Sequence, residues 1–210
     1  MVKNAMTSLI DWQKTVNGKK LLAYERSHLT QFLKQNFVDR MLQISGEPLI
    51  DLHAVHHYVL LQEHDESLNA PVPMVQANIN LKLPFRDESF QTIVICHAHE
   101  RVSSLPALFE EVERLLLPEG NLIVYGINFT SLWAVAVMFN VQYVPFCHRL
   151  FSDFEIKKNL KSLGFQYEYN TFGGIMKPEN FSLCFDMAYQ AHYTLVAKKT
   201  LSGLMFNAAV

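Results

Sequence analysis

Apolar and polar positions along the chain follow two spacings, one typical of helices and one typical of strands. Residues 18–37 repeat leucine and phenylalanine at helical spacing, with lysines and a glutamate between them. Residues 105–116 show the same kind of pattern, and Pro118 and Gly120 are expected to end that helix. Five short apolar runs predict buried strands, at residues 40–45, 57–62, 74–79, 91–96 and 121–128.

The remaining chain continues this alternation. One or two helical turns are expected within 47–55, an apolar helix near 131–140 and a polar helix near 152–162. Two further strands are expected near 165–171 and 191–198. Because strands and helices alternate, we predict a doubly wound, Rossmann-like α/β fold with a mostly parallel sheet and helices on both faces. Right-handed crossovers then place all the strand-to-helix turns at one edge of the sheet.

Composition narrows the class of protein. The 210 residues are 50% hydrophobic and 18% charged, which favours one folded domain and excludes a disordered chain. A formal net charge of −2 offers no general attraction for nucleic acid. Three cysteines without CxxC spacing and no secretion signal favour the cytoplasm. The segment 121–147 carries no formal charge, but polar residues interrupt it, so we expect no membrane span.

Ligands of such folds bind outside the carboxyl ends of the strands. The segments that reach this edge are Ser45–Glu47, Gln62–Asp65, Asn78–Asn80 and Cys96–Glu100. Gly46 lies where a nucleotide-binding fold carries its glycine-rich turn, although only one glycine is present. Glu63 follows Ser45 at about the spacing of a ribose-binding carboxylate, and Asp65 is the alternative.

The segment LPFRDESFQTIVICHAHERV, an intervening helix and then EVERLLLPEGNLIVYGIN together resemble the core of class I S-adenosylmethionine-dependent methyltransferases. The segment 128–133 and RMLQISG are similar to a small bacterial branch of that superfamily. This resemblance implies a seven-stranded sheet whose last strand is antiparallel. It also implies an N-terminal helical extension over 1–39 and a methyltransferase-like domain over 40–210.

The resemblance implies roles for several of these residues. Ser45, Gly46 and Glu47 would line the methionine part of S-adenosylmethionine, and Glu63 would hold its ribose hydroxyls. Asn78 and Ile79 would flank its adenine, and Cys96 and His97 would close the pocket beside its sulfonium. S-adenosylhomocysteine would be the product.

The first turn departs from the family pattern. Glu47 and Leu49 stand where two motif glycines are usual, and Gln43 replaces an acid that normally orders the loop. An alternative register would make LIDLHAVHH the first strand and supply Asp51 as that acid. That register is rejected because it leaves too little chain for a crossover before residue 74.

Candidates for catalysis follow the fourth strand. His97, His99 and Glu100 are the candidate acid–base residues, since histidine titrates near neutrality. Their alternative role is structural, as a strand cap and the start of the next turn. Neither this cluster nor His56-His57 with His64 forms a recognised metal-ligand set, so no metal is expected. The absence of GxGxxG disfavours NAD chemistry.

Two functions therefore remain. The first is a methyltransferase that acts on an unidentified small-molecule or macromolecular acceptor. The second is a methyltransferase-fold protein that no longer catalyses and instead binds a partner or regulates one. The second function is motivated by the glycine-poor turn, where Glu47 would repel the cofactor carboxylate, and by the apolar segment 129–146, a candidate homo-oligomer contact.

Overall fold

The computed structural model describes residues 9–51, 54–63, 71–128, 151–175 and 190–200. These residues build a seven-stranded sheet with the strand order β3-β2-β1-β4-β5-β7-β6. The strands are β1 (Arg40–Ile44), β2 (His57–Gln62), β3 (Met74–Gln76), β4 (Phe90–Cys96), β5 (Leu116–Ile127), β6 (Phe165–Ile175) and β7 (Gln190–Lys199). The predicted sheet and its first strand are confirmed, and the register that began at residue 49 is correctly rejected.

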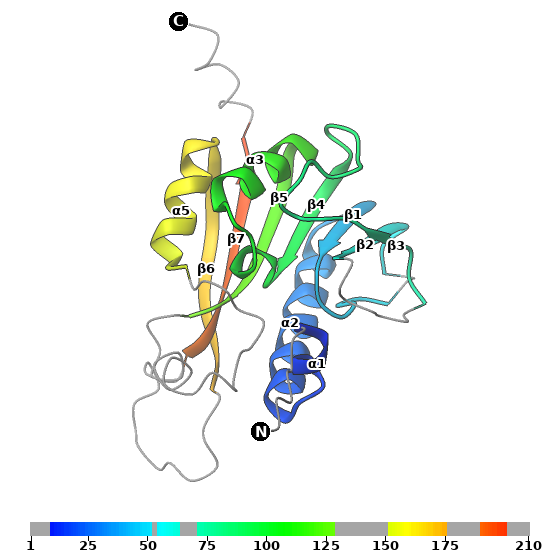
Figure 1. Ribbon diagram of the computed structural model, residues 1–210, viewed down its shortest axis with the longest axis vertical. Helices are drawn as coiled ribbons and strands as arrows, with labels where there is room; N and C mark the ends of the chain where they lie inside the picture. The colour runs from blue at the N-terminus through cyan, green and yellow to red at the C-terminus, as the bar shows by residue number, and fades with distance from the viewer. Residues whose placement is uncertain (1–8, 52–53, 64–70, 129–150, 176–189, 201–210) are drawn as a thin grey trace, which may run out of the picture.

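The first five strands are parallel, and β7 runs antiparallel to both of its neighbours, β5 and β6. This arrangement confirms the expected antiparallel last strand. Figure 1 shows β4 and β5 at the centre of the sheet. The direction in which successive strands are added reverses between the neighbours β1 and β4. Ligand sites of open α/β sheets lie at such a reversal, outside the carboxyl ends of the strands.

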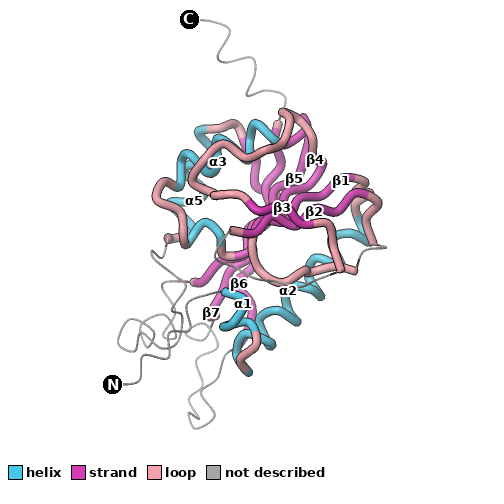
Figure 2. The backbone as a smooth tube through the Cα atoms, turned by 45° about the vertical axis from the view of Figure 1, so that its right-hand side comes forward, coloured by secondary structure: helices cyan, strands magenta, loops and turns pink. Residues whose placement is uncertain are grey.

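Helices cover both faces of the sheet, as the pattern predicts. The helix α2 (Val16–Gln35), preceded by α1 (Leu9–Gln13), lies on one face (Figures 1 and 2). The helices α3 (Leu105–Leu115) and α5 (Asp153–Ser162) lie on the other. Thr15, Ser104 and Ser152 cap the N-termini of α2, α3 and α5 with their hydroxyl oxygens, which accept otherwise unpaired backbone N–H groups.

Each face has its own apolar core. On the α2 face, Leu22, Leu29 and Phe32 pack against side chains of β1, β2, β4, β5 and β7. On the opposite face, the apolar stripe of α3 and two residues of α5, Ile156 and Leu160, pack against β1, β4 and β5. The sheet is therefore buried on both sides, which explains why its parallel strands read as nearly continuous apolar runs.

The structure differs from the sequence prediction in three places. Residues 47–51 and 54–56 contain no helical turn, so the connection from β1 to β2 is irregular. The strand β3 ends at Gln76 rather than at residue 79. The helix α3 ends at Leu115, and β5 starts at Leu116, because Leu116 already pairs with Phe90 before the ladder shifts register. Pro118 and Gly120 lie within that irregular part of β5.

Two expectations fall on residues that the structure does not describe. The predicted apolar helix near 131–140 and the candidate homo-oligomer contact at 129–146 both lie outside the described residues. Within the described part of the chain, no helix has the length and apolar character needed to cross a bilayer.

Candidate functional site

The predicted cofactor residues gather at the carboxyl edge of four neighbouring strands. Ser45–Glu47 follow β1, Glu63 follows β2, Asn78 and Ile79 follow β3, and Cys96 ends β4. Since β3, β2, β1 and β4 are adjacent in the sheet, the topology brings these segments to one edge although they span about a quarter of the chain. This is the edge at which parallel α/β sheets bind nucleotides.

The turn after β1 has a backbone conformation that favours glycine. Ser45 and Gly46 both have positive φ, 69° and 79°. A Cβ on Gly46 would lie 3.2 Å from Gln13 Nε2 and 3.3 Å from Cys96 Cβ. The single glycine of the motif is thus needed for its φ and for close packing against both β4 and α1.

Gln43 orders this turn in place of the usual acid. Its Nε2 donates to the carbonyls of Ser45 at 3.0 Å and Glu47 at 2.8 Å. Its Oε1 accepts from the Leu49 N–H at 3.0 Å and from the Tyr58 hydroxyl at 2.5 Å. The buried amide therefore uses both donors and both lone pairs, whereas a carboxylate has no donor for the two carbonyls.

Glutamines from two other elements also hold the turn. Gln62, the last residue of β2, donates from Nε2 to the Gly46 carbonyl at 2.7 Å. Gln13, the last residue of α1, accepts the Glu47 N–H on its Oε1 at 2.8 Å. The hydrogen bond from Glu47 to Gln13 thereby attaches α1 to the turn. The other amide atom of Gln62, the buried Oε1, has no hydrogen-bond partner.

Glu63 is paired with a residue that the sequence analysis did not select. Arg101 Nη2 lies 2.5 Å from Glu63 Oε2, and both side chains are largely buried. The same guanidinium donates from Nη1 to Ser45 Oγ at 3.5 Å. Arg101 thus connects the end of β2 with the turn after β1, inside the edge at which the cofactor residues meet.

The residues after β3 form a turn of their own. Asn78 Oδ1 accepts the Asn80 N–H at 2.9 Å, and Asn80 Oδ1 accepts from the N–H and the hydroxyl of Ser103. Asn78 is exposed, whereas Ile79 is buried in the core that α3 forms. Of this predicted pair, only Asn78 presents its side chain to solvent.

Glu47 points away from the strand ends. Its carboxylate lies 3.5 Å from Arg26 on α2, and both side chains are partly exposed. Together with Gln13, Lys14, Lys19, Leu22 and Ala23, these two residues line a cavity of about 550 Å³. The charge of Glu47 is thus partly balanced by an arginine of the N-terminal helix.

His97 is the most constrained of the three catalytic candidates. Its backbone is left-handed, with φ at 58°, and its side chain is fully buried. Nε2 lies 2.9 Å from Glu25 Oε1 and Nδ1 lies 3.2 Å from Glu100 Oε2. Burial lowers the pKa of His97, but the charge of Glu100 and hydrogen bonds to both glutamates outweigh it and raise the pKa to about 10. His97 is therefore an imidazolium at neutral pH.

His99 and Glu100 are also fully buried and have opposite electrostatic surroundings. Burial, aided by the charge of His97, lowers the pKa of His99 to about 4, so this ring is neutral at neutral pH. Burial raises the pKa of Glu100, but the His97 charge and hydrogen bonds from His97 and the Ile127 N–H bring it below its ordinary value. His99 Nε2 shares a 2.7 Å hydrogen bond with the Tyr193 hydroxyl of β7.

The geometry limits which of these groups can accept a proton. An imidazolium held between two carboxylates has no free lone pair, so His97 is unsuited to act as a general base at neutral pH. His99 is neutral, and its Nδ1 has no hydrogen-bond partner. Close packing holds this arrangement, because a Cβ on Gly126 would lie 2.3 Å from the Tyr193 hydroxyl oxygen and 2.7 Å from His99 Nε2.

The other cysteine and histidine candidates have no such arrangement. Cys96 is fully buried, and burial raises the pKa of its thiol well above the ordinary value, so this thiol is unreactive. His56 is exposed and lies 3.1 Å from Asp39, and His64 falls outside the described residues. Among the described residues, no group of three or more His, Cys, Asp or Glu side chains has the geometry of a metal site.

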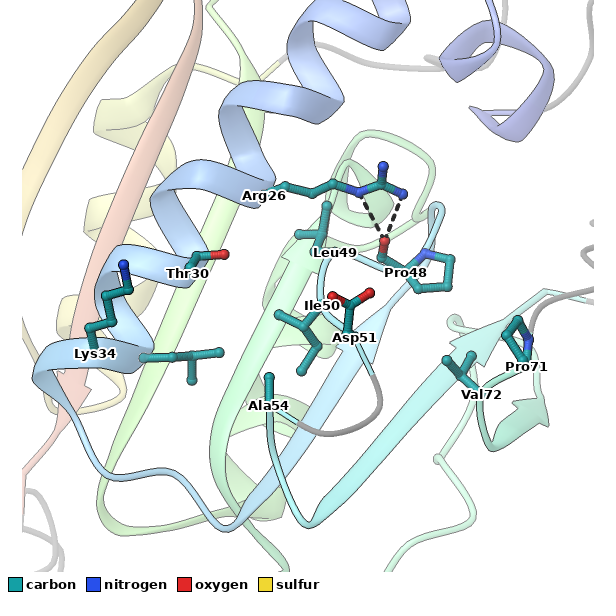
Figure 3. Close-up of a pocket in the computed structure, with 11 residues that line it drawn as sticks. Arg26, Thr30, Lys34, Pro48, Leu49, Ile50, Asp51, Ala54, Pro71 and Val72 are labelled. Carbon is teal, nitrogen blue, oxygen red and sulfur yellow. Dashed lines mark hydrogen bonds between the residues drawn. The ribbon is translucent and has the colours of Figure 1, made fainter.

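A cavity of about 870 Å³ lies apart from the predicted residues (Figure 3). It lies between α2 and the irregular connection from β1 to β2, and none of the predicted site residues lines it. Arg26 crosses one end and donates two hydrogen bonds to the Pro48 carbonyl, at 3.2 and 3.0 Å.

Comparisons with known proteins support the fold. Residues 49–124 match the family model described as a methyltransferase domain. A search of curated protein sequences finds no match to the chain.

Several solved structures have the same fold. A SAM-dependent methyltransferase from Archaeoglobus fulgidus is 15% identical with a TM-score of 0.62, and the match covers 83% of this chain and 94% of that one. A SAM-dependent methyltransferase from Thermotoga maritima, suggested to be a histamine N-methyltransferase, is 14% identical with a TM-score of 0.59, covering 91% and 100%.

A third structure contains a partner protein. It is the complex of the Haloferax volcanii methyltransferase activator Trm112 with a protein considered to be a methyltransferase, at 12% identity and a TM-score of 0.65, covering 91% of this chain and 97% of that one. At such identities the likeness establishes the fold. The chain has the fold of these SAM-dependent methyltransferases, and its residues 49–124, about a third of the chain, match a family model described as a methyltransferase domain.

Proposed function

We propose that the protein is an S-adenosylmethionine-dependent methyltransferase. The observation that carries this proposal is that Arg101 connects the left-handed turn at Ser45 and Gly46 with Glu63, the residue that follows the neighbouring strand β2. A tight glycine turn after the first strand and a carboxylate after the second strand stand at the positions where such folds bind a nucleotide cofactor.

The residues at this edge fit such a cofactor. Ser45 and Gly46 would hold its methionine part and Glu63 its ribose, whereas the Glu47 carboxylate lies beside Arg26 of α2. Asn78 would contact the adenine. Ile79, Cys96 and His97 are buried and would form the floor of the site beneath the adenine and the sulfonium. The buried and unpaired Oε1 of Gln62, one residue before Glu63, supports a polar ligand here.

The cofactor supplies an activated methyl group on its sulfonium. The chain's own contribution is to bind, to orient and to exclude water, since a displacement reaction depends mainly on holding its two reactants in line. In this proposal, His97 acts as a fixed positive charge that orients Glu25 and Glu100, and His99 is the neutral group able to accept a proton.

Isothermal titration calorimetry with S-adenosylhomocysteine tests the proposal. We expect a micromolar dissociation constant for the wild-type chain. For Glu63→Ala the dissociation constant should be at least tenfold larger, because the ribose hydroxyls lose their carboxylate partner. Glu110→Ala, an exposed position on α3, is the matched control and should bind like the wild type. No heat and no thermal shift at millimolar ligand would overturn the proposal.

A second candidate function is supported by the contacts of the turn. Leu9 and Gln13 of α1 lie against Gly46, and Gln13 already accepts the Glu47 N–H. A chain whose own helix occupies this turn suits a methyltransferase-fold protein that binds a partner without catalysis. The same titration separates the two functions, because binding of S-adenosylhomocysteine by the wild type excludes an occupied turn.

The names of the structural neighbours do not select a methyl acceptor. One is suggested to act on histamine, whereas the CurJ enzyme is named as a carbon methyltransferase. Since one fold supports many acceptors, the class of acceptor has to be argued from the residues of this chain.

A further inference from the structure

The α2 face of the sheet contains an unusual group of buried polar side chains near β5 and β7. His192 and Thr194 of β7 lie opposite Ile127 and Tyr125 of β5. They point to the α2 face of the sheet, because Val196, two residues beyond Thr194, packs in the core beneath α2. Both side chains are almost completely buried.

The middle of α2 lies directly over these two residues. The Tyr24 ring contacts the His192 ring edge-on, with centroids 4.4 Å apart. The Tyr125 hydroxyl donates to the Glu25 carbonyl at 3.4 Å and shares a 2.8 Å hydrogen bond with His28 Nδ1. One turn of α2 therefore lies against β5 and β7 and brings these polar side chains to one region of this face.

Three side chains of this region have buried atoms with no hydrogen-bond partner. They are Glu25 Oε2, both ring nitrogens of His192 and Thr194 Oγ1. Each unpaired buried polar group costs about 1–3 kcal/mol, so native proteins rarely retain one without a reason. Several at one place indicate that a polar ligand completes their hydrogen bonds.

The charge of the region indicates the sign of that ligand. Glu25 and Glu100 are two carboxylates around a single imidazolium, that of His97, which leaves one formal negative charge. Burial and the His97 charge lower the pKa of His192 to about 3, so this ring adds no positive charge at neutral pH. In the part of the chain that the structure describes, neither carboxylate pairs with a lysine or arginine.

We propose that Glu25, His192 and Thr194 form the binding site of the methyl acceptor, and that the acceptor presents a protonated primary amine. An ammonium has three N–H donors and one positive charge, which match three acceptors and one uncompensated carboxylate. The rings of Tyr24 and Tyr125 add faces or edges that suit a cation. An alcohol acceptor offers one donor and leaves the buried charge unbalanced.

The amine must change its protonation state before it reacts. An ammonium has no lone pair, so it must lose one proton before its nitrogen can accept a methyl group. Solvent water takes that proton, because a His192 ring whose pKa is lowered to about 3 is too weak a base to remove it, and the nitrogen becomes a neutral amine with a free lone pair. Glu25, held in place through its other oxygen by His97, then faces the nitrogen on which positive charge develops.

This inference rests on the proposed function for its role in catalysis, but amine binding is measured without the cofactor. We compare ethylammonium with ethanol, which is similar in size, in thermal unfolding at pH 7.5. At ten times its dissociation constant, ethylammonium should stabilise the protein by about 1.4 kcal/mol and raise the Tm by about 3–6 °C, and ethanol should not.

Thr194→Val is the central variant because it keeps the shape of the side chain. It removes an unpaired buried hydroxyl, so it should fold at least as stably as the wild type without amine, and its response to ethylammonium should fall several-fold. Thr92→Val is the matched control, since Thr92 Oγ1 on β4 is equally buried and unpaired. It should gain the same stability and keep the full response. Glu25→Gln should remove the response altogether.

The outcomes separate the two proposals. Equal shifts by ethylammonium and ethanol, or a wild-type response in Thr194→Val, would overturn the amine site. If S-adenosylhomocysteine binds and ethylammonium does not, the acceptor proposal alone fails. If ethylammonium binds and S-adenosylhomocysteine does not, the amine site stands and the methyltransferase proposal fails.

Discussion

The two halves of the carboxyl edge are built in opposite ways. Around β1 and β2, the polar side chains mostly bond to backbone atoms, and Gln43 uses every donor and acceptor that it has. Around β4, β5 and β7, the polar side chains bond mainly to one another, and Glu25, His99, His192 and Thr194 each keep an unpaired buried atom. The first half fixes a backbone shape and, among its described side chains, leaves Gln62 Oε1 unpaired, whereas the second half retains more unsatisfied charge and hydrogen-bonding capacity.

The difference teaches what each half can contribute. A turn whose carbonyls and N–H groups are already held needs no reorganisation when a ligand approaches, which lowers the cost of binding. A buried group with unpaired atoms instead costs stability until a ligand pairs them. We therefore expect substitutions in the first half to act mainly on folding, and substitutions in the second half to act mainly on pH dependence and ligand response.

The largest effect is expected for Gln43→Leu. The substitution leaves two carbonyls, one N–H and the Tyr58 hydroxyl without their buried partner, so the free energy of unfolding should fall by about 4 kcal/mol. Urea unfolding at pH 7 measures this loss. Gln76→Leu, at an exposed position of β3, should change the free energy by about 0.5 kcal/mol or less.

Gln43→Glu sharpens the same comparison. It restores the acid that the family usually has, yet a carboxylate cannot donate to the carbonyls of Ser45 and Glu47. We expect it to be nearly as destabilised as Gln43→Leu. If Gln43→Glu were as stable as the wild type, the turn would accommodate either residue, and the hydrogen bonds of Gln43 would not determine its shape.

The next largest loss of stability is expected for Arg101→Met. This substitution removes the ion pair in which Arg101 Nη2 lies 2.5 Å from Glu63 Oε2. Because both side chains are largely buried, the free energy of unfolding should fall by about 3 kcal/mol. In the double variant with Glu63→Gln, the uncompensated charge is gone and much of that loss should be recovered. A double-mutant cycle in urea measures this coupling, and simple additivity of the two substitutions would contradict it.

The pH dependence should reveal the second half of the edge. The pKa of His192 is lowered to about 3 and that of His99 to about 4, both below the unfolded value near 6.5. Between these values the unfolded chain binds more protons than the folded chain, so stability is lost as pH falls. In His192→Asn, the loss between pH 7 and pH 5 should be smaller than in the wild type by about 2 kcal/mol.

The opposite sign is expected above neutrality. The pKa of His97 is raised to about 10, so its stabilising contribution is complete below pH 6.5 and is lost as pH rises through 10. Urea unfolding between pH 5 and 10 should therefore give a maximum near neutrality. His57→Asn, at an exposed position, is the control and should keep the wild-type profile. A flat profile in the wild type would contradict the buried arrangement.

Much of the fold was predictable from the sequence because it depends on repeated spacing. Strands buried on both faces produce continuous apolar runs, and the register beginning at Arg40 was favoured by the length needed for a crossover. The residues of the first half were also predictable by position, since Ser45, Gly46 and Glu63 directly follow strands. The start of β5 was not, because its pairing with Phe90 is a tertiary contact.

The second half was less predictable because its residues come from distant elements. His97 and Glu25 are separated by 72 positions. One signal was present: Glu25 stands four residues after Leu21 and four before Leu29, so it belongs to the buried stripe of α2 rather than to its polar face. Arg101 and His192 had no comparable signal, since their burial follows from the packing of several segments.

The smallest effect is expected for Glu47→Ala, and it tests the boundary between the two functions. The backbone of residue 47 holds the turn through hydrogen bonds with Gln13 and Gln43. The Glu47 carboxylate lies 3.5 Å from the Arg26 guanidinium, and both side chains are partly exposed. Such pairs contribute about 0–0.5 kcal/mol, so stability should hardly change. The dissociation constant of S-adenosylhomocysteine should remain within about twofold, because the carboxylate lies beside α2. Tightening by tenfold or more in calorimetry would mean that Glu47 repels the ligand, and would favour the non-catalytic function.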